Sequence, residues 1–404
     1  MLRLSPTAKR CLIAGVLLLG LLVFFRERLK GMASLERIPD FHISFRQHDG
    51  PPTREQKLKE IRAWQKKEDI KKIVGFVFYG RRAQASILDC YLRRNLKSNG
   101  GILDQVLWLQ RTDDVYDRAL LNEMINSEPL YAKTTPDDKD GYASAYDDVQ
   151  DDVLYVKIDT DIVFIEDTTI ISMVHLRATR PDFFVVGANV INQPLSSWVH
   201  WSLGAPVDWR ASLLPAWSGA DDFDIEKWEP PEGRKHRWLP VTDRRDHVLD
   251  KTPIVETQYD AYSGPGWWKW TIGAQAHYSL FENLERGEMW RYRFGLWDYR
   301  DLRMGLQFVA LTGRDINLAK PIDKDDEGHL CATMPKRLGR SAVADGGGVA
   351  VHFSFDSQSA GMAKTDILER YRAYAQEKIC KGRMLWTSPA DDERLMRGMP
   401  LPAG

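Results

Sequence analysis

The chain has 404 residues, 43% of them hydrophobic and 28% charged, which fits two or three globular domains or one large domain with extensions. Its 56 Lys and Arg residues nearly balance 57 Asp and Glu residues, giving a net charge of -1. This balance argues against a nucleic-acid partner, because phosphate binding needs concentrated positive charge. Four cysteines exclude a disulfide scaffold. Fourteen tryptophans are unusual, and eleven of them fall between positions 198 and 297.

The apolar run 11–25 predicts a transmembrane signal-anchor. It reads CLIAGVLLLGLLVFF, without a charge or a proline. As a helix it spans about 22 Å, which is short for a hydrocarbon core of about 30 Å, but Arg10 and Arg26 can snorkel at its ends. A cleaved signal peptide is the alternative, although the charges directly after the run are poor context for cleavage. An anchor leaves 1–10 as a cytoplasmic tail, and both alternatives place the rest of the chain in a secretory lumen.

Apolar strands alternate with amphipathic helices after a charged stem at 26–70. Short apolar runs, typical of strands buried on both faces, predict strands at 73–79, 106–109, 153–158 and 183–186. Helices are predicted at 83–96, 113–124, 168–177, 274–286 and 363–377, and further apolar pieces complete the sheet at 306–311 and 349–355. This alternation predicts an α/β fold: a Rossmann-type, mostly parallel sheet flanked by helices. We expect it in one domain at 71–380, followed by a tail at 381–404.

Three cysteines follow the predicted anchor. A secretory lumen is oxidising, so Cys90, Cys331 and Cys380 can supply one disulfide. Cys331–Cys380 is the pair that we would test first, which leaves one cysteine over. Three buried thiols are the alternative.

The sharpest chemical motif is Asp159-Thr160-Asp161, which directly follows the predicted strand 153–158. Ligands of open α/β sheets bind beyond the carboxyl ends of the strands, so both carboxylates are candidate ligands of Mg²⁺ or Mn²⁺. His352, near the end of a late apolar run, is a third candidate ligand. The ordinary alternatives are a solvated turn for the carboxylates and a hydrogen-bonded core position for the histidine.

With this motif in place, the chain resembles a family of fungal type II membrane proteins with a glycosyltransferase-like domain of the GT-A type. The resemblance runs from about Lys72 to Glu377. Its landmarks are GRR (80–82), LDCYLRRNL (88–96), YVKIDTDIVFIED (155–167), GANVINQPLSSWVHWSLGA (187–205), AQAHYSLFENLE (274–285), DDEGHL (325–330) and HFSFDSQ (352–358). The family commonly has DDD where this chain has Asp159-Thr160-Asp161, so both outer carboxylates are kept.

The resemblance implies a nucleotide-sugar donor and assigns residues to it. Asp159 and Asp161 would bind the metal and the donor's diphosphate. The end of the first strand would contact the nucleotide, through Phe78, Tyr79, Gly80, Arg81 and Arg82. For the two arginines, which suit phosphate, a salt bridge to the neighbouring helix is the alternative.

The Trp-rich part, about 190–300, would form the acceptor side. Aromatic rings stack on the C–H faces of sugars, and core packing is the alternative for any single tryptophan. The favoured side chains are Trp198, Trp201, Trp267, Trp268 and Trp270.

An inverting transferase needs a base for the acceptor hydroxyl. Glu282 is the first candidate, Asp326 and Glu327 are its rivals, and His277 could orient the base or the acceptor. We therefore expect a single-pass type II glycosyltransferase of the Golgi or endoplasmic reticulum membrane. It would use Mn²⁺ or Mg²⁺ to transfer a sugar from a nucleotide-sugar to a hydroxyl of a glycan or glycoconjugate. Alternatives are a phosphosugar transferase, a silent glycan-binding membrane protein, and a haloacid-dehalogenase-type phosphatase with Asp159 as nucleophile. In such phosphatases, the motif that contains the nucleophile normally lies on the first strand of the domain.

Overall fold

The computed structural model describes residues 51–136, 143–203, 205, 265–268 and 270–397. The strands are β1 (Lys72–Tyr79), β2 (Gln105–Gln110), β3 (Tyr131–Thr134), β4 (Val153–Asp159), β5 (Ile162–Ile165), β6 (Phe183–Ile191), β7 (Leu296–Asp298), β8 (Phe308–Thr312) and β9 (Ser341–His352). The longer helices are α2 (Arg54–Glu68), α3 (Arg82–Asn95), α4 (Val115–Ser127), α5 (Thr169–Thr179), α6 (Pro194–Ser202), α7 (Trp270–Arg286), α12 (Ile367–Lys378) and α13 (Ala390–Arg397). Shorter helical segments are η1 (Lys97–Asn99), η3 (Ala143–Tyr146), η7 (Pro265–Trp267), η8 (Met289–Tyr292), α8 (Gly313–Leu318), α9 (Asp326–Gly328), η9 (His329–Thr333), α10 (Met334–Leu338) and α11 (Asp356–Met362).

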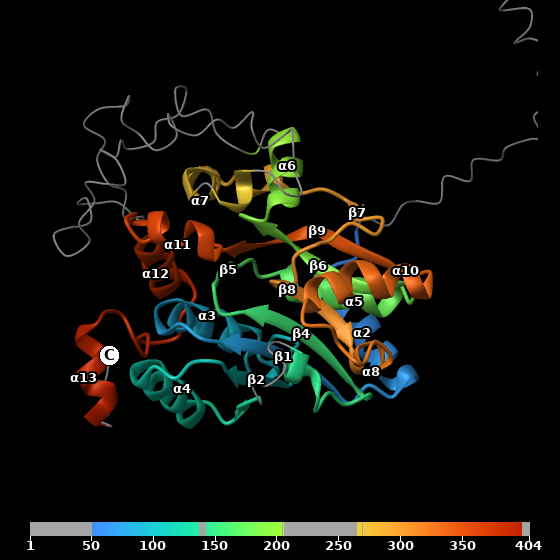
Figure 1. Ribbon diagram of the computed structural model, residues 1–404, viewed down its shortest axis with the longest axis horizontal. Coiled ribbons are helices and arrows are strands. Elements are labelled where there is room, and N and C mark those ends of the chain that lie inside the picture. Colours follow the sequence, from blue (N-terminus) through green and yellow to red (C-terminus); the bar gives the residue numbers. More distant parts are fainter. Residues whose placement is uncertain (1–50, 137–142, 204, 206–264, 269, 398–404) are drawn as a thin grey trace, which may run out of the picture. The chain divides into compact units, whose positions relative to one another are not determined.

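The strands form one mixed sheet in the order β3-β2-β1-β4-β8-β6-β9-β5, with β7 beside β9. Strands β3, β2, β1 and β4 run parallel to one another, and β6 is parallel to β9. Strand β8 runs antiparallel to both of its neighbours. Helices flank the sheet (Figure 1). The predicted α/β class, with a mostly parallel sheet between helices, is confirmed at this level.

The order of the first four strands creates a position for a ligand. From β1 the chain moves outward to β2 and β3, and then returns to the other side of β1 with β4. The carboxyl ends of β1 and β4 therefore lie at a topological switch point. In open α/β sheets, ligands bind in the crevice at such a point.

Side chains alternate between the two faces of β1, because a strand has a period of two. Ile73 and Val77 join a core that contains residues of α3, α4, α5, α7 and α12. Phe76 and Phe78 join a second core with residues of η3, α8, η9 and α10. Both faces of the sheet are thus covered at β1, which explains why this strand is a nearly continuous apolar run.

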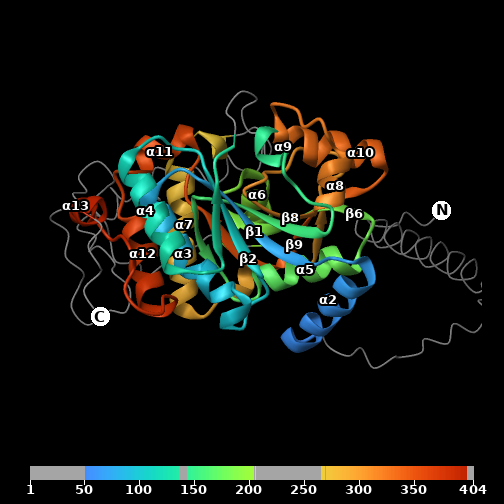
Figure 2. The same cartoon turned by 90° about the horizontal axis from the view of Figure 1, so that it is seen from below.

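The folded unit extends beyond the boundaries expected from the sequence. Helix α2, which falls within the expected stem 26–70, packs against α5 (Figure 2). Lys57 Nζ donates to Ser172 Oγ at 3.0 Å between these helices. Trp386, in the expected tail 381–404, is buried, and α13 packs on α4.

No helix in the described part of the chain is both long and apolar enough to cross a membrane. The predicted anchor 11–25 lies outside that part.

The disulfide joins Cys90 of α3 to Cys380, just beyond α12. The predicted Cys331–Cys380 pair is therefore wrong. Helices α3 and α12 pack together on one side of the sheet, and this brings the Cα atoms of the bonded pair to 4.8 Å. Cys331 is a buried free thiol in the core on the opposite side. One disulfide with one cysteine left over was one of the two alternatives that the sequence left open, and three buried thiols were the other.

Candidate functional site

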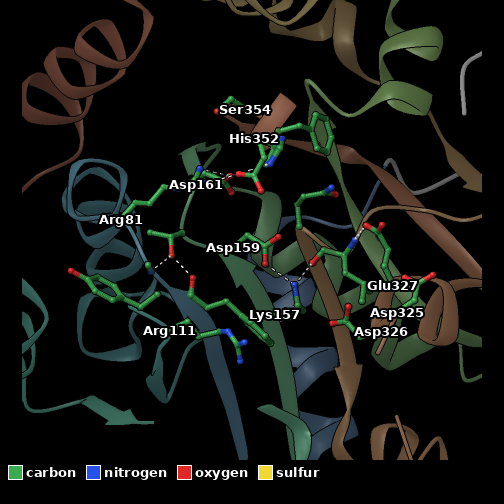
Figure 3. A pocket seen from close by; sticks show the side chains of 18 of the residues that line it. Arg81, Arg111, Lys157, Asp159, Asp161, Asp325, Asp326, Glu327, His352 and Ser354 are labelled. Carbon is green, nitrogen blue, oxygen red and sulfur yellow. Dashed lines mark hydrogen bonds and ion pairs between the residues drawn. The ribbon is translucent and has the colours of Figure 1, made fainter. Parts of the chain in front are cut away.

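A cavity of about 860 Å³ lies at the switch point. Residues 78–81 at the end of β1 and residues 159–161 at the end of β4 form part of its wall. His352, the last residue of β9, and the acidic segment 325–327 complete the polar lining. Figure 3 shows Asp161 near His352, with the acidic segment across the cavity from Arg81. The fold thus brings the DxD motif, the end of the first strand and His352 into one site.

Thr160 holds the DxD turn against the end of β1. Its hydroxyl donates to the carbonyl of Phe78 and accepts the backbone N–H of Gly80 at 3.1 Å. An ionised aspartate in this position could not donate to the carbonyl. The threonine therefore supports the turn while both outer carboxylates remain at the cavity.

Asp161 lies in a cationic environment. Its Oδ2 is 3.2 Å from His352 Nε2 and 3.8 Å from a guanidinium nitrogen of Arg81. Burial alone would raise the pKa of Asp161, but His352 and Arg81 outweigh burial and lower it. Burial would lower the pKa of His352, but Asp161 outweighs it, so this pKa is raised. On its other side, His352 Nδ1 lies 3.4 Å from the carbonyl oxygen of Asn192.

Asp159 is paired with a buried lysine. Lys157 Nζ lies 2.6 Å from Asp159 Oδ1 and donates to the carbonyl of Leu306 at 2.9 Å. Burial raises the pKa of Asp159 to about 6, with Asp161 adding to the rise and Lys157 opposing it. The pKa of Lys157 is raised as well, because its acidic neighbours outweigh burial.

Within the described residues, no group of three or more His, Cys, Asp or Glu side chains forms a ready-made metal cage. The local geometry nevertheless fits a cation held partly by substrate. Mg²⁺ typically takes one or two carboxylates plus substrate phosphates, and two ligands at right angles lie about 3 Å apart. The spacing of 3.2 Å between Asp161 and His352 matches this separation. Asp161 Oδ1 and Gln307 Oε1, both in side chains that line the cavity, are buried without a hydrogen-bond partner in the described structure. Asn192 would orient a ligating His352.

The acidic segment 325–327 contains two of the predicted bases, and their carboxylates have different contacts. Glu327 accepts the backbone N–H of Leu306 at 2.9 Å with one oxygen and pairs with Arg303 at 2.8 Å through the other. Asp326 accepts a hydrogen bond from Tyr146 at Oδ2, at 2.8 Å. Both oxygens of Glu327 are thus engaged by the protein, whereas the contact of Asp326 is made by one oxygen.

The other two predicted catalytic residues are not among those that line the cavity. His277 is fully buried between the hydroxyl of Tyr371 and the carbonyl of Phe353, at 2.9 Å from each. Burial lowers the pKa of His277 to about 3, so it is a neutral core histidine. Glu282 pairs with Arg286 one turn along α7.

The two arginines after β1 lie in different surroundings. Arg81 lines the cavity and contacts Asp356 at 2.6 Å as well as Asp161. Arg82 is not among the lining residues and pairs with Asp117 at 2.8 Å and Asp392 at 3.0 Å. Arg82 therefore occupies the salt bridge to a neighbouring helix that was the alternative to phosphate contact, and only Arg81 is placed for a ligand.

One predicted tryptophan lines the cavity. Trp267 packs against Phe355, with ring centroids 4.4 Å apart. Trp268 is 53% exposed and is not among the lining residues, and Trp270 packs against the main core. Trp198 and Trp201 are both in α6, and their side chains lie outside the described structure.

Several polar residues that line the cavity were not predicted from the sequence: Arg111, Lys157, Arg303, Gln307, Lys324, Ser354 and Asp356. Lys157 alone has a local signal. It is a charged residue within an apolar strand, two positions before Asp159, and residues i and i+2 lie on the same face of a strand.

Neither models of known protein families nor curated protein sequences match this chain.

Proposed function

We propose that the chain is a metal-dependent glycosyltransferase with a GT-A-type catalytic domain. The main support is the position of Asp159 and Asp161, which lie at a topological switch point and line a cavity of about 860 Å³. This volume is within the usual range for small-molecule sites, about 300–1,000 Å³. A carboxylate pair at the carboxyl ends of β1 and β4 suits a divalent cation together with the diphosphate of a nucleotide-sugar.

In this proposal, the donor lies along the end of β1. Phe78, Tyr79 and Gly80 line the cavity at the end of β1 and would contact the nucleotide, while Arg81 would pair with the diphosphate. Asp159, Asp161 and His352 would hold Mn²⁺ or Mg²⁺. The ion would offset negative charge on the diphosphate as it leaves.

Asp326 is the residue that we assign as general base. It lines the cavity, and a hydrogen bond from Tyr146 fixes the orientation of its carboxylate. The acceptor hydroxyl would give its proton to Asp326 as its oxygen bonds to the anomeric carbon of the sugar. The bond from that carbon to the diphosphate would break at the same time, with its electron pair leaving on the nucleoside diphosphate. This route inverts the configuration at the anomeric carbon.

Two further features support the proposed acceptor and compartment. Trp267, at the cavity wall, would stack on a sugar ring of a glycan or glycoconjugate acceptor. The Cys90–Cys380 disulfide supports an oxidising compartment, in agreement with a luminal domain of a type II protein in the Golgi or endoplasmic reticulum.

Product analysis tests this function. The full chain would be incubated with a nucleotide-sugar panel, Mn²⁺ and a glycan acceptor array. Release of a nucleoside diphosphate together with a glycosylated acceptor supports the proposal. A nucleoside monophosphate would instead indicate phosphosugar transfer, free phosphate would indicate a phosphatase acting through Asp159, and glycan binding without turnover would indicate a silent binding protein.

A further inference from the structure

Lys157 places a cation inside the wall of the cavity. Only 5% of the residue is exposed. Its ammonium group contacts Asp159 Oδ1 at 2.6 Å and the carbonyl of Leu306 at 2.9 Å, and it lies 4.4 Å from the centre of the Phe78 ring. An ammonium group has three protons, and these three contacts account for them. The ammonium group of Lys157 is therefore held beside the carboxylate of Asp159.

This contact changes what Asp159 can offer to a ligand. Its Oδ1 is held by Lys157, and its backbone N–H donates to the carbonyl of Gln307 at 2.9 Å. The side chain and the backbone of Asp159 are both fixed by the same wall, formed by β4 and the segment before β8. Lys157 therefore competes with a cation for Oδ1, whereas it makes no such contact with Oδ2.

The charges around the turn are nearly balanced. The carboxylates of Asp159 and Asp161 are offset by the ammonium group of Lys157 and the guanidinium of Arg81. Asp326, on the facing wall, adds a further negative charge that acts on Lys157. The buried ammonium group of Lys157 itself repels a free divalent cation and attracts an anion, and both effects are larger in a medium of low dielectric constant than in water.

We propose that Lys157 is a selectivity residue: it competes with a cation for one oxygen of Asp159 and shifts the site away from free divalent cations and toward a nucleoside diphosphate. The inference rests on the proposed function, since it assigns Lys157 to the same site. Lys157 acts through Asp159 and through its charge, so it is a positioning residue. The site would then take up its metal together with the nucleotide.

Calorimetric titration of the full chain tests this inference. Wild type and Lys157→Met would be titrated with Mn²⁺ alone, and with ADP, CDP, GDP and UDP in the presence of saturating Mn²⁺. We expect Lys157→Met to bind Mn²⁺ alone about fivefold more tightly or better, and its preferred diphosphate about fivefold more weakly or worse, the lower end of usual coupling strengths. Opposite shifts are diagnostic, because general damage to the fold weakens both.

Two further variants serve as the control and as the substitute for a Lys157→Met chain that does not fold. Lys71→Met removes the lysine of a pair with the same N–O distance, 2.6 Å to Asp152, at the opposite end of β1 and β4. It should leave both affinities unchanged. If Lys157→Met does not fold, Lys157→Gln keeps a hydrogen-bond donor while removing the charge, and the same opposite shifts are expected.

Unchanged affinities, or two shifts in the same direction, in a folded Lys157 variant would overturn the inference while leaving the glycosyltransferase proposal intact. A wild-type chain that binds none of the four diphosphates would instead overturn the proposed function. The two failures are therefore distinguishable.

Discussion

Asp161 and His352 meet at 3.2 Å between Oδ2 and Nε2, although they are far apart in the sequence. The cause is strand pairing: β5 begins directly after Asp161 and runs antiparallel to β9, with Ile162 opposite His352. The register of two strands thus places an imidazole beside the second carboxylate of the DxD motif.

We predict that His352→Ala weakens Mn²⁺-dependent binding of a nucleoside diphosphate by about tenfold or more. The substitution removes one proposed ligand, and losses of about 10–100-fold are usual even for groups that only orient a ligand. Isothermal titration calorimetry measures the loss, with circular dichroism as the check of folding. His175→Ala is the matched control, because His175 pairs with Glu60 at 2.6 Å between α5 and α2. Equal affinities of the His352 variant and wild type would exclude the histidine from the site.

Asp326→Asn should lower kcat by about 10²–10⁴-fold, the usual contribution of a general base. Diphosphate affinity should stay within about twofold of wild type, because Asp326 is assigned to the acceptor side. Glu282→Gln should leave kcat unchanged, since Glu282 pairs with Arg286 and is not among the lining residues. Initial rates of nucleoside diphosphate release provide the measurement. The opposite pattern would restore Glu282 as the base.

A buried charge cluster supports the sheet away from the cavity. Asp315, at the start of α8, contacts Arg177 of α5, and its Oδ1 lies 2.5 Å from a guanidinium nitrogen of Arg340. Removing one partner of a buried pair typically costs about 3–5 kcal/mol, so Asp315→Asn should lower the free energy of unfolding by that amount at pH 7. Urea denaturation measures it. Asp152→Asn, in an exposed pair with Lys71, is the control and should show no resolvable loss.

The stability lost in Asp315→Asn should also depend on pH. Burial alone would raise the pKa of Asp315, but Arg340 and Arg177 outweigh burial and lower it. A carboxyl whose pKa is lower in the folded state stabilises the fold above its unfolded pKa of about 3.9, and this stabilisation is lost as the pH falls below that value. The difference in unfolding free energy between wild type and Asp315→Asn should therefore shrink from pH 5 to pH 3. A constant difference would contradict the assignment.

Cys90→Ser should lower the free energy of unfolding by about 2–5 kcal/mol, because the disulfide closes a long loop, with its cysteines 290 residues apart. Reductant should destabilise wild type but not this variant. Peptide mapping without reduction should recover Cys90 linked to Cys380, with Cys331 labelled only after unfolding. A Cys331–Cys380 peptide would show that the original sequence prediction was right.

The apolar strands near the site could be predicted from the sequence. The runs at 73–79 and 153–158 match β1 and β4 to within one residue at each end, since both faces of these strands are buried. Strand β9 was predicted only in its last third, because the part before it, SAVADGGG, lacks a continuous apolar run. Strand β3, YAKT, is too short and too polar to give a signal.

The site was only partly predictable, for a physical reason. Asp159 and Asp161 follow an apolar strand directly, so their position at its carboxyl end is a local property. The choice among Asp326, Glu327 and Glu282 depends on which carboxylates the protein itself engages, and the partners come from distant segments: Tyr146 for Asp326 and Arg303 for Glu327. Such pairings have no local sequence pattern.

The most direct test of the glycosyltransferase site is calorimetric titration of the full chain with ADP, CDP, GDP and UDP, with and without Mn²⁺. Wild type, Asp161→Asn and Asp356→Asn would be compared, with folding checked by circular dichroism. We predict Mn²⁺-dependent binding of one diphosphate by wild type. This binding should be abolished in Asp161→Asn and retained in Asp356→Asn, because the Asp356 side chain lines the cavity but is 91% exposed. Absence of binding to all four diphosphates, or equal binding by folded Asp161→Asn and wild type, would contradict this prediction.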